Sequence, residues 1–375
     1  MRNPRLVTFA LAAALAARPC AANVVIRPHF GHPLIFPERV VFSSVNGKSL
    51  IAIDKQGRLQ WELSFSERIQ PQRLDAASVV IQEGRSVFQI DVVSGKKSLY
   101  RRVPKNARFE VDSDLGITYL WDSRPNHRET LVLAGDGRTP RWTTRNVEAI
   151  EHVTSTTIVA LKTVRQERAD SSFTITGATL VGLDRDSGEV RWSLSPPGSP
   201  PEFLRSVAVG GNLAVLSGLF AATLLVLNPD TGQVLSSRTG RFTDLAEAGS
   251  RLAVLEEGEG PGDAGLSFCE LPECAPGKAV ALKAKEILQF RLHGDYVITA
   301  GIYDMACFSR STAKRLWQKG QMEWSIPFED SMIVTDFEAQ SHTSRIVSIR
   351  LSDGTETVLF TRPVTKRDEN EFLPW

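Results

Sequence analysis

The chain has 375 residues, of which 42% are hydrophobic and 23% are charged, and its formal net charge at pH 7 is +1. This composition provides enough apolar side chains for a large core and excludes a mostly disordered chain. The near-neutral charge argues against a surface that neutralises phosphates, so we expect no nucleic-acid partner.

The first 22 residues differ in composition from the rest of the chain. Arg2 and Arg5 give a basic start, residues 6–17 form an apolar run, and small residues precede Asn23. This layout is typical of a secretory signal, and the apolar run is too short to span a bilayer comfortably. We therefore predict cleavage after Ala22, export to the periplasm or the extracellular space, and no transmembrane span in the mature chain.

An alternative is that Cys20 becomes the lipidated N-terminus of the mature protein. Arg18 and Pro19 lie where lipoprotein signals use small and aliphatic residues, so cleavage after Ala22 is preferred over lipid anchoring. Residues 1–22 contain three arginines and no acidic residue, so their removal would lower the formal charge from +1 to −2.

From residue 50 onward a short phrase recurs: an aliphatic run, an Asp or Asn, a turn that ends in Gly, and often a Trp. It reads LIAIDKQGRLQW at residues 50–61, VFQIDVVSGKKSL at 87–99, LVGLDRDSGEVRW at 180–192 and LLVLNPDTGQVLS at 224–236. A period of roughly 40 to 45 residues, built from strand and turn signals alone, predicts an all-β fold of the β-propeller type.

Each phrase specifies a β-hairpin. The Asp or Asn side chain can accept hydrogen bonds from turn amides, and the Gly supplies a positive φ that a side chain would penalise. The predicted turn residues are Asp54, Gly57, Asp91, Gly95, Asp184, Gly188, Asn228 and Gly232. Large rings on the outermost strands would cover the seams between blades. The residues expected in this structural role are Trp61, Trp142, Trp192 and Trp317.

The turn positions give the number of blades. Eight marks follow one another at a mean spacing of about 42 residues, namely Gly57, Gly95, Gly137, Gly188, Gly232, Gly277, Ala313 and Gly354. Gly277 is a weak mark, and without it the count is seven. Residues 23–375 divide by eight into blades of about 44 residues, the size of four short strands with their turns. The sequence therefore favours a single domain over residues 23–375, with eight blades of four antiparallel strands, over the seven-bladed alternative.

Three cysteines remain in residues 23–375. Cys269 and Cys274 are five residues apart with Pro272 between them, so a turn can bring them together as a disulfide in an oxidising compartment. Cys307 lies in the apolar run MACFS and is interpreted as a small buried hydrophobic residue.

We predict no metal-binding and no catalytic residue. His29 and His32 have a spacing that a metal can use, but no Cys, Asp or Glu nearby in the sequence completes the ligand set. Residues 184–189 (DRDSGE) resemble part of a calcium loop, yet they coincide with a repeat turn and lack its distant Glu. No short nucleophile motif is present. A catalytic set assembled from distant loops at the central channel of a propeller stays open as an alternative.

Two insertions lengthen individual blades. One is residues 162–177 (KTVRQERADSSFTITG), and the other is residues 256–265 followed by the loop from Cys269 to Cys274. Because length added to a repeat emerges as a loop on one face, either insertion can serve as an interaction arm. A solvated loop without a function is the alternative.

The recurring phrase resembles the tryptophan-docking repeat of the quinoprotein-type, or PQQ-like, propellers. The best matches are residues 184–192 and 228–232, and the resemblance covers residues 40–360. This family includes quinone-dependent dehydrogenases and non-catalytic binding propellers, such as the propeller subunit of the outer-membrane β-barrel assembly machinery. The chain has neither an adjacent Cys pair nor a Cys-x-x-Cys-His motif, so we expect no cofactor and disfavour PQQ with calcium.

The resemblance to the assembly subunit fits the size, the export signal and the blade count. It implies an exported, monomeric, non-catalytic scaffold propeller that binds another envelope or extracellular protein. Two alternatives remain from other classes of function. One is a PQQ-like oxidoreductase or other enzyme with its site in the central channel, and the other is a carbohydrate or ligand sensor.

Overall fold

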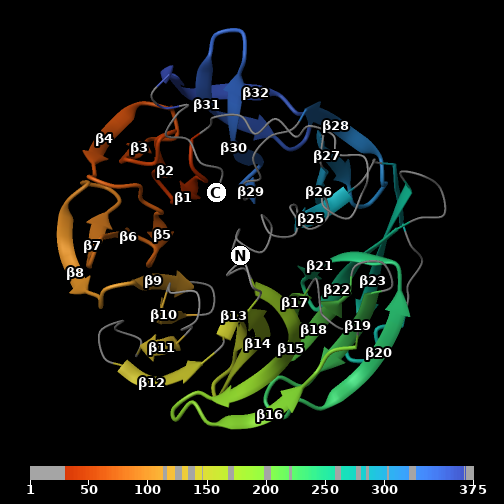
Figure 1. The fold of residues 1–375 in the computed structure, drawn as a ribbon. Coiled ribbons are helices and arrows are strands. Elements are labelled where there is room, and N and C mark those ends of the chain that lie inside the picture. Colours follow the sequence, from red (N-terminus) through yellow and green to blue (C-terminus); the bar gives the residue numbers. More distant parts are fainter. Residues whose placement is uncertain are drawn as a thin grey trace. The chain divides into compact units, whose positions relative to one another are not determined.

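A computed structural model gives the fold of the chain (Figure 1). The expected signal, with Cys20 and His29, lies outside the residues that the structure describes, so those expectations stay predictions. The described residues are 30–112, 116–122, 129–133, 140–145, 147–167, 173–197, 204–218, 222–257, 263–275, 280–283, 287–301, 304–320, 327–366 and 368. The chain forms two compact units, of which the first is residues 1–123, 134–138 and 322–375 and the second is residues 124–133 and 139–321.

The first unit contains three complete four-stranded sheets. Their strands are β1 (Leu34–Ile35), β2 (Val40–Ser43), β3 (Ser49–Ile53) and β4 (Leu59–Ser64); β5 (Gln72–Arg73), β6 (Ser78–Glu83), β7 (Ser86–Asp91) and β8 (Lys97–Arg102); and β29 (Pro327–Phe328), β30 (Ser331–Glu338), β31 (Thr343–Arg350) and β32 (Glu356–Pro363). A further sheet has the order β12-β11-β10-β9 and consists of β9 (Ala107–Asp112), β10 (Ile117–Asp122), β11 (Glu129–Leu133) and β12 (Pro140–Arg145).

The second unit contains four complete four-stranded sheets. Their strands are β13 (Val147–Val153), β14 (Thr157–Glu167), β15 (Phe173–Asp184) and β16 (Val190–Leu194); β17 (Leu204–Val209), β18 (Asn212–Ser217), β19 (Ala222–Leu227) and β20 (Val234–Gly240); β21 (Phe242–Ala248), β22 (Arg251–Glu257), β23 (Asp263–Glu270) and β24 (Val280–Lys283); and β25 (Ile287–His293), β26 (Tyr296–Gly301), β27 (Asp304–Ser309) and β28 (Arg315–Gly320).

All eight sheets are antiparallel, and each uses four strands in sequence order. This is the repeat unit of a β-propeller, in which each sheet is one blade. The prediction of an all-β propeller with eight blades of four strands is therefore confirmed, and the seven-bladed alternative is not.

Burial along the strands explains why the sheets form. All four residues of β2 and all six of β19 are buried, whereas the fourth strand β20 alternates between exposed and partly buried residues. The middle strands are covered on both faces by neighbouring sheets, and for this reason they read as continuous apolar runs. The fourth strand has one open edge and one face to solvent, which suits its mixed composition.

Apolar clusters join neighbouring sheets within each unit. In the second unit Leu216 and Leu224 of one sheet pack with Phe242, Leu252 and Val254 of the next. Dispersion and burial between sheets, rather than within one sheet, therefore stabilise the fold.

In the first unit the last sheet packs against the first. Phe42 and Ile51 share a cluster with Ile333 and Ile346. The Phe360 ring lies 5.7 Å from the Phe42 ring, measured between centroids. These contacts join residues about 300 positions apart along the chain, and they give both sheets a buried face.

Candidate functional site

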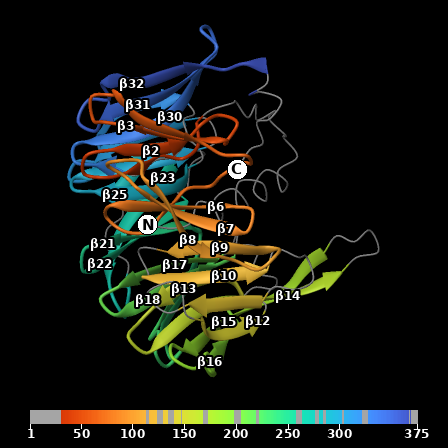
Figure 2. The ribbon, with the colours of Figure 1, turned by 90° about the vertical axis from the view of Figure 1, so that its left-hand side faces the viewer.

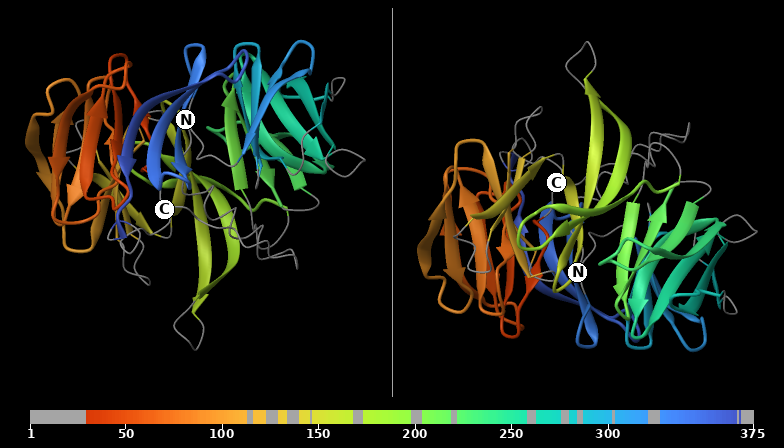
Figure 3. Two further views of the ribbon diagram at one scale, coloured as in Figure 1. Left: turned by 90° about the horizontal axis from the view of Figure 1, so that it is seen from above. Right: turned by 90° about the horizontal axis from the view of Figure 1, so that it is seen from below.

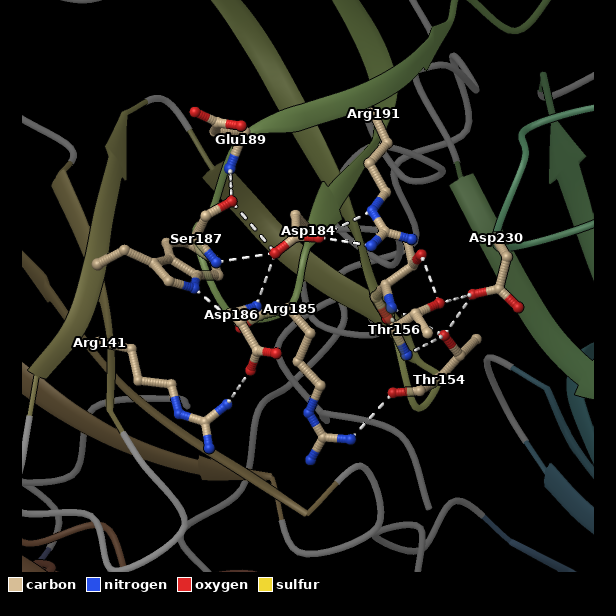
Figure 4. Close-up of polar contacts among 12 residues, drawn as sticks. Arg141, Thr154, Thr156, Asp184, Arg185, Asp186, Ser187, Glu189, Arg191 and Asp230 are labelled. Atoms are coloured by element: carbon tan, nitrogen blue, oxygen red, sulfur yellow. Dashed lines mark hydrogen bonds and ion pairs between the residues drawn. The ribbon is translucent and has the colours of Figure 1, made fainter.

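The hairpin turn at Asp184 is the best-defined polar site of the repeat (Figure 4). Its Oδ1 accepts hydrogen bonds from the backbone amides of Asp186 at 2.9 Å and Ser187 at 2.8 Å, and its Oδ2 accepts one from Arg191 Nε at 3.0 Å. The Ser187 amide and the Arg191 guanidinium hold the pKa of the Asp184 carboxyl well below its usual range. The ionised carboxylate thus fixes the turn.

The other predicted turn residues act in the same way. The side-chain oxygen Oδ1 of Asn228 accepts from the Thr231 amide at 3.1 Å, and that of Asp91 accepts from the Ser94 amide at 2.7 Å. Asp54 Oδ1 accepts from the Gln56 amide at 3.0 Å. Hydrogen bonds from Ser94 likewise lower the pKa of the Asp91 carboxyl. These side chains therefore pair with turn amides that would otherwise depend on water.

A tryptophan from one sheet lies over the turn of the next sheet. The indole Nε1 atoms donate to backbone carbonyl oxygens at 3.0 Å, from Trp61 to Val92, from Trp142 to Arg185 and from Trp192 to Pro229. Each acceptor is the residue after the Asp or Asn of the next phrase. These three tryptophans thus lie between neighbouring sheets, where the sequence predicted them. In each case the ring packs on a turn of the next sheet, and the indole NH donates to a carbonyl of that turn.

The glycines of these turns meet two requirements at once. Gly95, Gly188 and Gly232 have φ values of 69°, 75° and 70°. A Cβ atom at these positions would lie 2.8, 2.4 and 2.5 Å from the indole of Trp61, Trp142 and Trp192 respectively. Any other residue would therefore strain the backbone and displace the ring.

A register shift in the outer strand pair marks the tryptophan position. Trp61 pairs with Ala52, Trp192 with Gly182 and Trp317 with Cys307, in each case next to a register shift. Trp317 is 7% exposed on β28. The extra twist of a β-bulge turns the Trp61 and Trp192 side chains toward the next sheet. Trp142 pairs with Val132 in the same way. In the sequence this position is marked only by its distance from the turn glycine, which is four residues for Trp61 and Trp192 and five for Trp142.

The sixth sheet departs from the pattern. Cys269 and Cys274 form a disulfide, and Cys274 has a φ of 44°. The amide of Cys274 donates to the Glu270 carbonyl at 2.8 Å, as the Gly232 amide does to the Asn228 carbonyl at 2.9 Å. Cys274 thus occupies the turn-glycine position that the sequence analysis assigned to Gly277. Both Gly277 and Gly137 lie outside the described residues.

Further polar contacts link the Asp184 turn to its neighbours (Figure 4). Thr156 Oγ1 donates to Asp230 Oδ1 of the following sheet at 2.7 Å, and Arg141 Nη1 of the preceding sheet lies 3.1 Å from Asp186 Oδ1. Hydroxyl donors, above all Thr154, lower the pKa of the Asp230 carboxyl. Asp230 and Asp186 accept hydrogen bonds from side chains of the adjacent sheets, so the network links neighbouring sheets.

The first insertion is a long hairpin that extends past its own sheet. Pairing of β14 with β13 ends at Lys162, and pairing of β15 with β16 begins at Leu180. Residues 163–167 of β14 pair with residues 173–178 of β15, and within the described residues the outer edges of this ribbon are open. Figures 2 and 3 show this hairpin, in yellow-green, reaching beyond β13 and β16.

Within the described residues, no group of three or more His, Cys, Asp or Glu side chains could hold a metal ion. Burial raises the pKa of the Cys307 thiol to about 12, and this side chain is fully buried, as the sequence analysis expected. In the same part of the chain no helix is long and apolar enough to cross a membrane.

Comparison with known proteins supports the assignment of the repeat to the PQQ-like class. A family described as outer membrane protein assembly factor BamB matches residues 14–202, about half of the chain. No curated protein shows significant sequence similarity to it.

Several solved structures share the fold. Dihydro-heme d1 dehydrogenase NirN is 12% identical with a TM-score of 0.57, covering 92% of this chain and 75% of that one. The computationally designed protein Ika8 is 11% identical with a TM-score of 0.55, covering 89% and 96%. AztD from Citrobacter koseri is 12% identical with a TM-score of 0.51, covering 83% and 91%. Identities this low show a common fold alone.

Proposed function

Since this chain belongs to the PQQ-like repeat family described as outer membrane protein assembly factor BamB, we propose that it is an exported, non-catalytic scaffold that binds another protein of the cell envelope. The family description supports the envelope, and the composition of residues 1–22 supports export. The docked tryptophan and the turn network tie neighbouring sheets of the second unit together, and this supports a firm framework whose loops present a binding surface.

The long hairpin is the observation that carries the proposal. Residues 163–167 and 173–178 form a two-stranded ribbon whose outer backbone groups have no strand partner within the described residues. Unpaired strand edges are a template for a strand from another chain, and proteins normally keep such edges short or cover them. A ribbon of this length is therefore best explained by a partner that pairs with it.

The test is to shorten the ribbon without disturbing its sheet. Replacement of residues 164–177 by Asn-Gly would make Thr163 and Ala178, which already pair, the last pair before a two-residue turn. Tagged wild-type and shortened proteins are purified from the native envelope in mild detergent, and retained proteins are identified by mass spectrometry. We expect a stoichiometric partner with the wild type and its loss with the short hairpin.

Two controls accompany this experiment. Thermal unfolding of both proteins checks that the sheet survives, and sequencing of the mature N-terminus checks cleavage after Ala22. A wild-type protein that purifies alone from its own envelope, or a partner that binds the short variant equally well, would contradict the proposal.

A further inference from the structure

Positive charge is concentrated in one short stretch of the first unit. Residues 85–108 contain seven Lys or Arg residues and a single carboxylate, Asp91, so this stretch carries a formal charge of +6. Because the whole chain carries only +1, the rest of it is acidic, with a charge of −5. The near-neutral total thus conceals one strongly basic segment, which creates a local positive field at the protein surface.

The strand register places part of this charge along β8, the outermost strand of its sheet. Among the described residues β8 pairs with β7 alone, so its other edge is open. Lys97, Leu99 and Arg102 pair with every second residue of β7 and therefore lie on the same face of the sheet. A strand of six residues is about 20 Å long, so the charge is spread along a line rather than gathered at a point.

Three cations gather at one end of β8, around Val103. The Val103 amide donates to the Arg85 carbonyl at 2.9 Å, and Arg85 Nε donates to the Val103 carbonyl at 3.3 Å. Arg102 directly precedes Val103, and Lys105 follows it by two residues. All three cationic residues are exposed, and in the described part of the chain none of them forms an ion pair. Their charge is therefore available to an external anion.

A fourth free cation and two aliphatic side chains continue this surface. Lys96, just before β8, is exposed and forms no ion pair within the described ranges, whereas Lys97 is already held by Glu83, with 3.3 Å between Nζ and Oε2. Leu99 is 52% exposed, and Val93 in the preceding turn is 53% exposed. The basic stripe is defined as Arg85, Val93, Lys96, Leu99, Arg102 and Lys105.

The repeat itself does not call for this charge. Arg102 lies one residue beyond the position that carries the tryptophan in other sheets, where Glu62, Ser193 and Ser237 are found. The Arg102 side chain makes no hydrogen bond or ion pair with any described residue. Neither the turn nor the contact between sheets therefore accounts for a cation at this place.

We propose that the basic stripe lies against an anionic lipid surface. Headgroup phosphates occur at every spacing on such a surface, so a line of cations can bind them without a shaped pocket. The guanidinium groups of Arg85 and Arg102 suit phosphate oxygens in particular, and Leu99 and Val93 would lie at the headgroup boundary. The inference goes beyond the proposed binding of a partner protein and takes from that proposal only the location in the cell envelope.

The test is sedimentation of the purified protein with lipid vesicles. One preparation is phosphatidylcholine with about 30% phosphatidylglycerol, and the other is phosphatidylcholine alone. We expect binding to the anionic vesicles only, weakened at least about tenfold when the salt concentration rises from about 50 mM to about 500 mM. Equal binding to both preparations, or no binding to the anionic vesicles at the lower salt concentration, would overturn the inference.

Charge reversal locates the binding surface. Arg102→Glu with Lys105→Glu should weaken binding to the anionic vesicles at least about tenfold, because two attractive charges become repulsive. The matched control is Arg241→Glu with Lys314→Glu, which changes the net charge equally at two exposed residues of the second unit. The control should bind within about twofold of the wild type. Equal losses in both variants would show an effect of net charge alone and would overturn the assignment.

A dye at Leu99 reports direct contact with lipid. Leu99→Cys is labelled with an environment-sensitive dye, and Leu235→Cys on β20, where Leu235 is 38% exposed, is the matched control. The buried thiol of Cys307 and the bonded pair Cys269 and Cys274 leave the introduced thiol as the reactive one among the described residues. We expect a blue shift with anionic vesicles for the dye at position 99 alone. No shift there, or an equal shift at both positions, would contradict the proposal.

Co-purification in detergent separates this inference from the scaffold function. The variant with Arg102→Glu and Lys105→Glu should retain the partner of the wild type although it no longer binds vesicles, and this result supports both. Loss of the partner in detergent, where no bilayer is present, would assign the stripe to an acidic polypeptide and overturn the lipid assignment while the scaffold function stands. Vesicle binding by a protein that purifies without any partner overturns the scaffold function and leaves the basic stripe supported.

Discussion

Trp192 of one sheet and Gly232 of the next are in such close contact that a single added methyl group would overlap the indole, with 2.5 Å between a Cβ atom and the ring. The same indole donates its NH to the Pro229 carbonyl at 3.0 Å. The contact between two sheets thus depends on the indole ring, the turn glycine and the carbonyl group. Substitution of the tryptophan or the glycine can test its contribution to stability.

Gly232→Ala should destabilise the protein more than a glycine substitution at an open turn. The alanine must adopt a φ near 70°, at a cost of about 1 kcal/mol, and it must displace the ring at a further cost of about 1–3 kcal/mol. Gly210→Ala is the control, because Gly210 has a φ of 56° and no atom within 4 Å of the added methyl. Urea unfolding measures both, and equal losses would show that the ring is not tightly packed.

Trp192→Ala should lower the free energy of unfolding by about 3 kcal/mol, the low end for a large aromatic residue, because the ring is only partly buried. Trp192→Phe keeps most of the ring but loses the hydrogen bond to Pro229, which corresponds to about 1 kcal/mol. Urea denaturation of both variants gives the two contributions. A Trp192→Ala variant as stable as the wild type would contradict the structural role of the tryptophans between sheets.

Ala313→Gly should stabilise the protein slightly. Ala313 replaces the repeat glycine and has a φ of 57°, and relief of that conformation is worth about 1–2 kcal/mol. The greater freedom of glycine in the unfolded chain offsets about 0.5–1 kcal/mol of this gain. The unfolding midpoint should therefore rise, and a lower midpoint would mean that the alanine methyl makes packing contacts that outweigh the strain.

Stability should depend on the ionisation of Asp184. The pKa of its carboxyl is lower in the folded chain than in the unfolded chain, so its contribution is fully present above the unfolded value. It is lost as the pH falls below about 4 toward the folded pKa. Asp184→Asn should make the decline in the urea midpoint between pH 5 and pH 3 shallower than in the wild type. Parallel declines would contradict this role.

The features predicted from sequence are those that local chemistry specifies. The phrase of Asp184 and Gly188 predicted its own turn, because side-chain acceptor, positive φ and strand all lie within a few residues. The distance from Gly188 to Trp192 likewise reflects a bulge that lies within one hairpin. Repetition then supplied the blade count.

Two features that sequence reasoning missed depend on which residues the strand register brings together. Cys274 takes the place of a turn glycine, as the hydrogen bond from its amide to the Glu270 carbonyl shows. The sequence pattern had pointed to Gly277 instead, because the pattern calls for a glycine at this place. A pocket of about 210 Å³ lies between two sheets and is lined by Ser236 of one and Cys274 of the next. Such paired changes are visible only once the register is known.

The first sheet packs against the last one, so its apolar face is covered only late in folding. Arg362 donates to both carboxylate oxygens of Glu62, at 3.0 and 2.8 Å, and Ile346 lies in one cluster with Ile51. These contacts can form only when nearly the whole chain has been synthesised. Until then, one apolar face of the first sheet stays exposed. Contacts this distant in sequence slow folding and leave intermediates prone to aggregate. The first sheet therefore depends on protection from aggregation until the last sheet has formed.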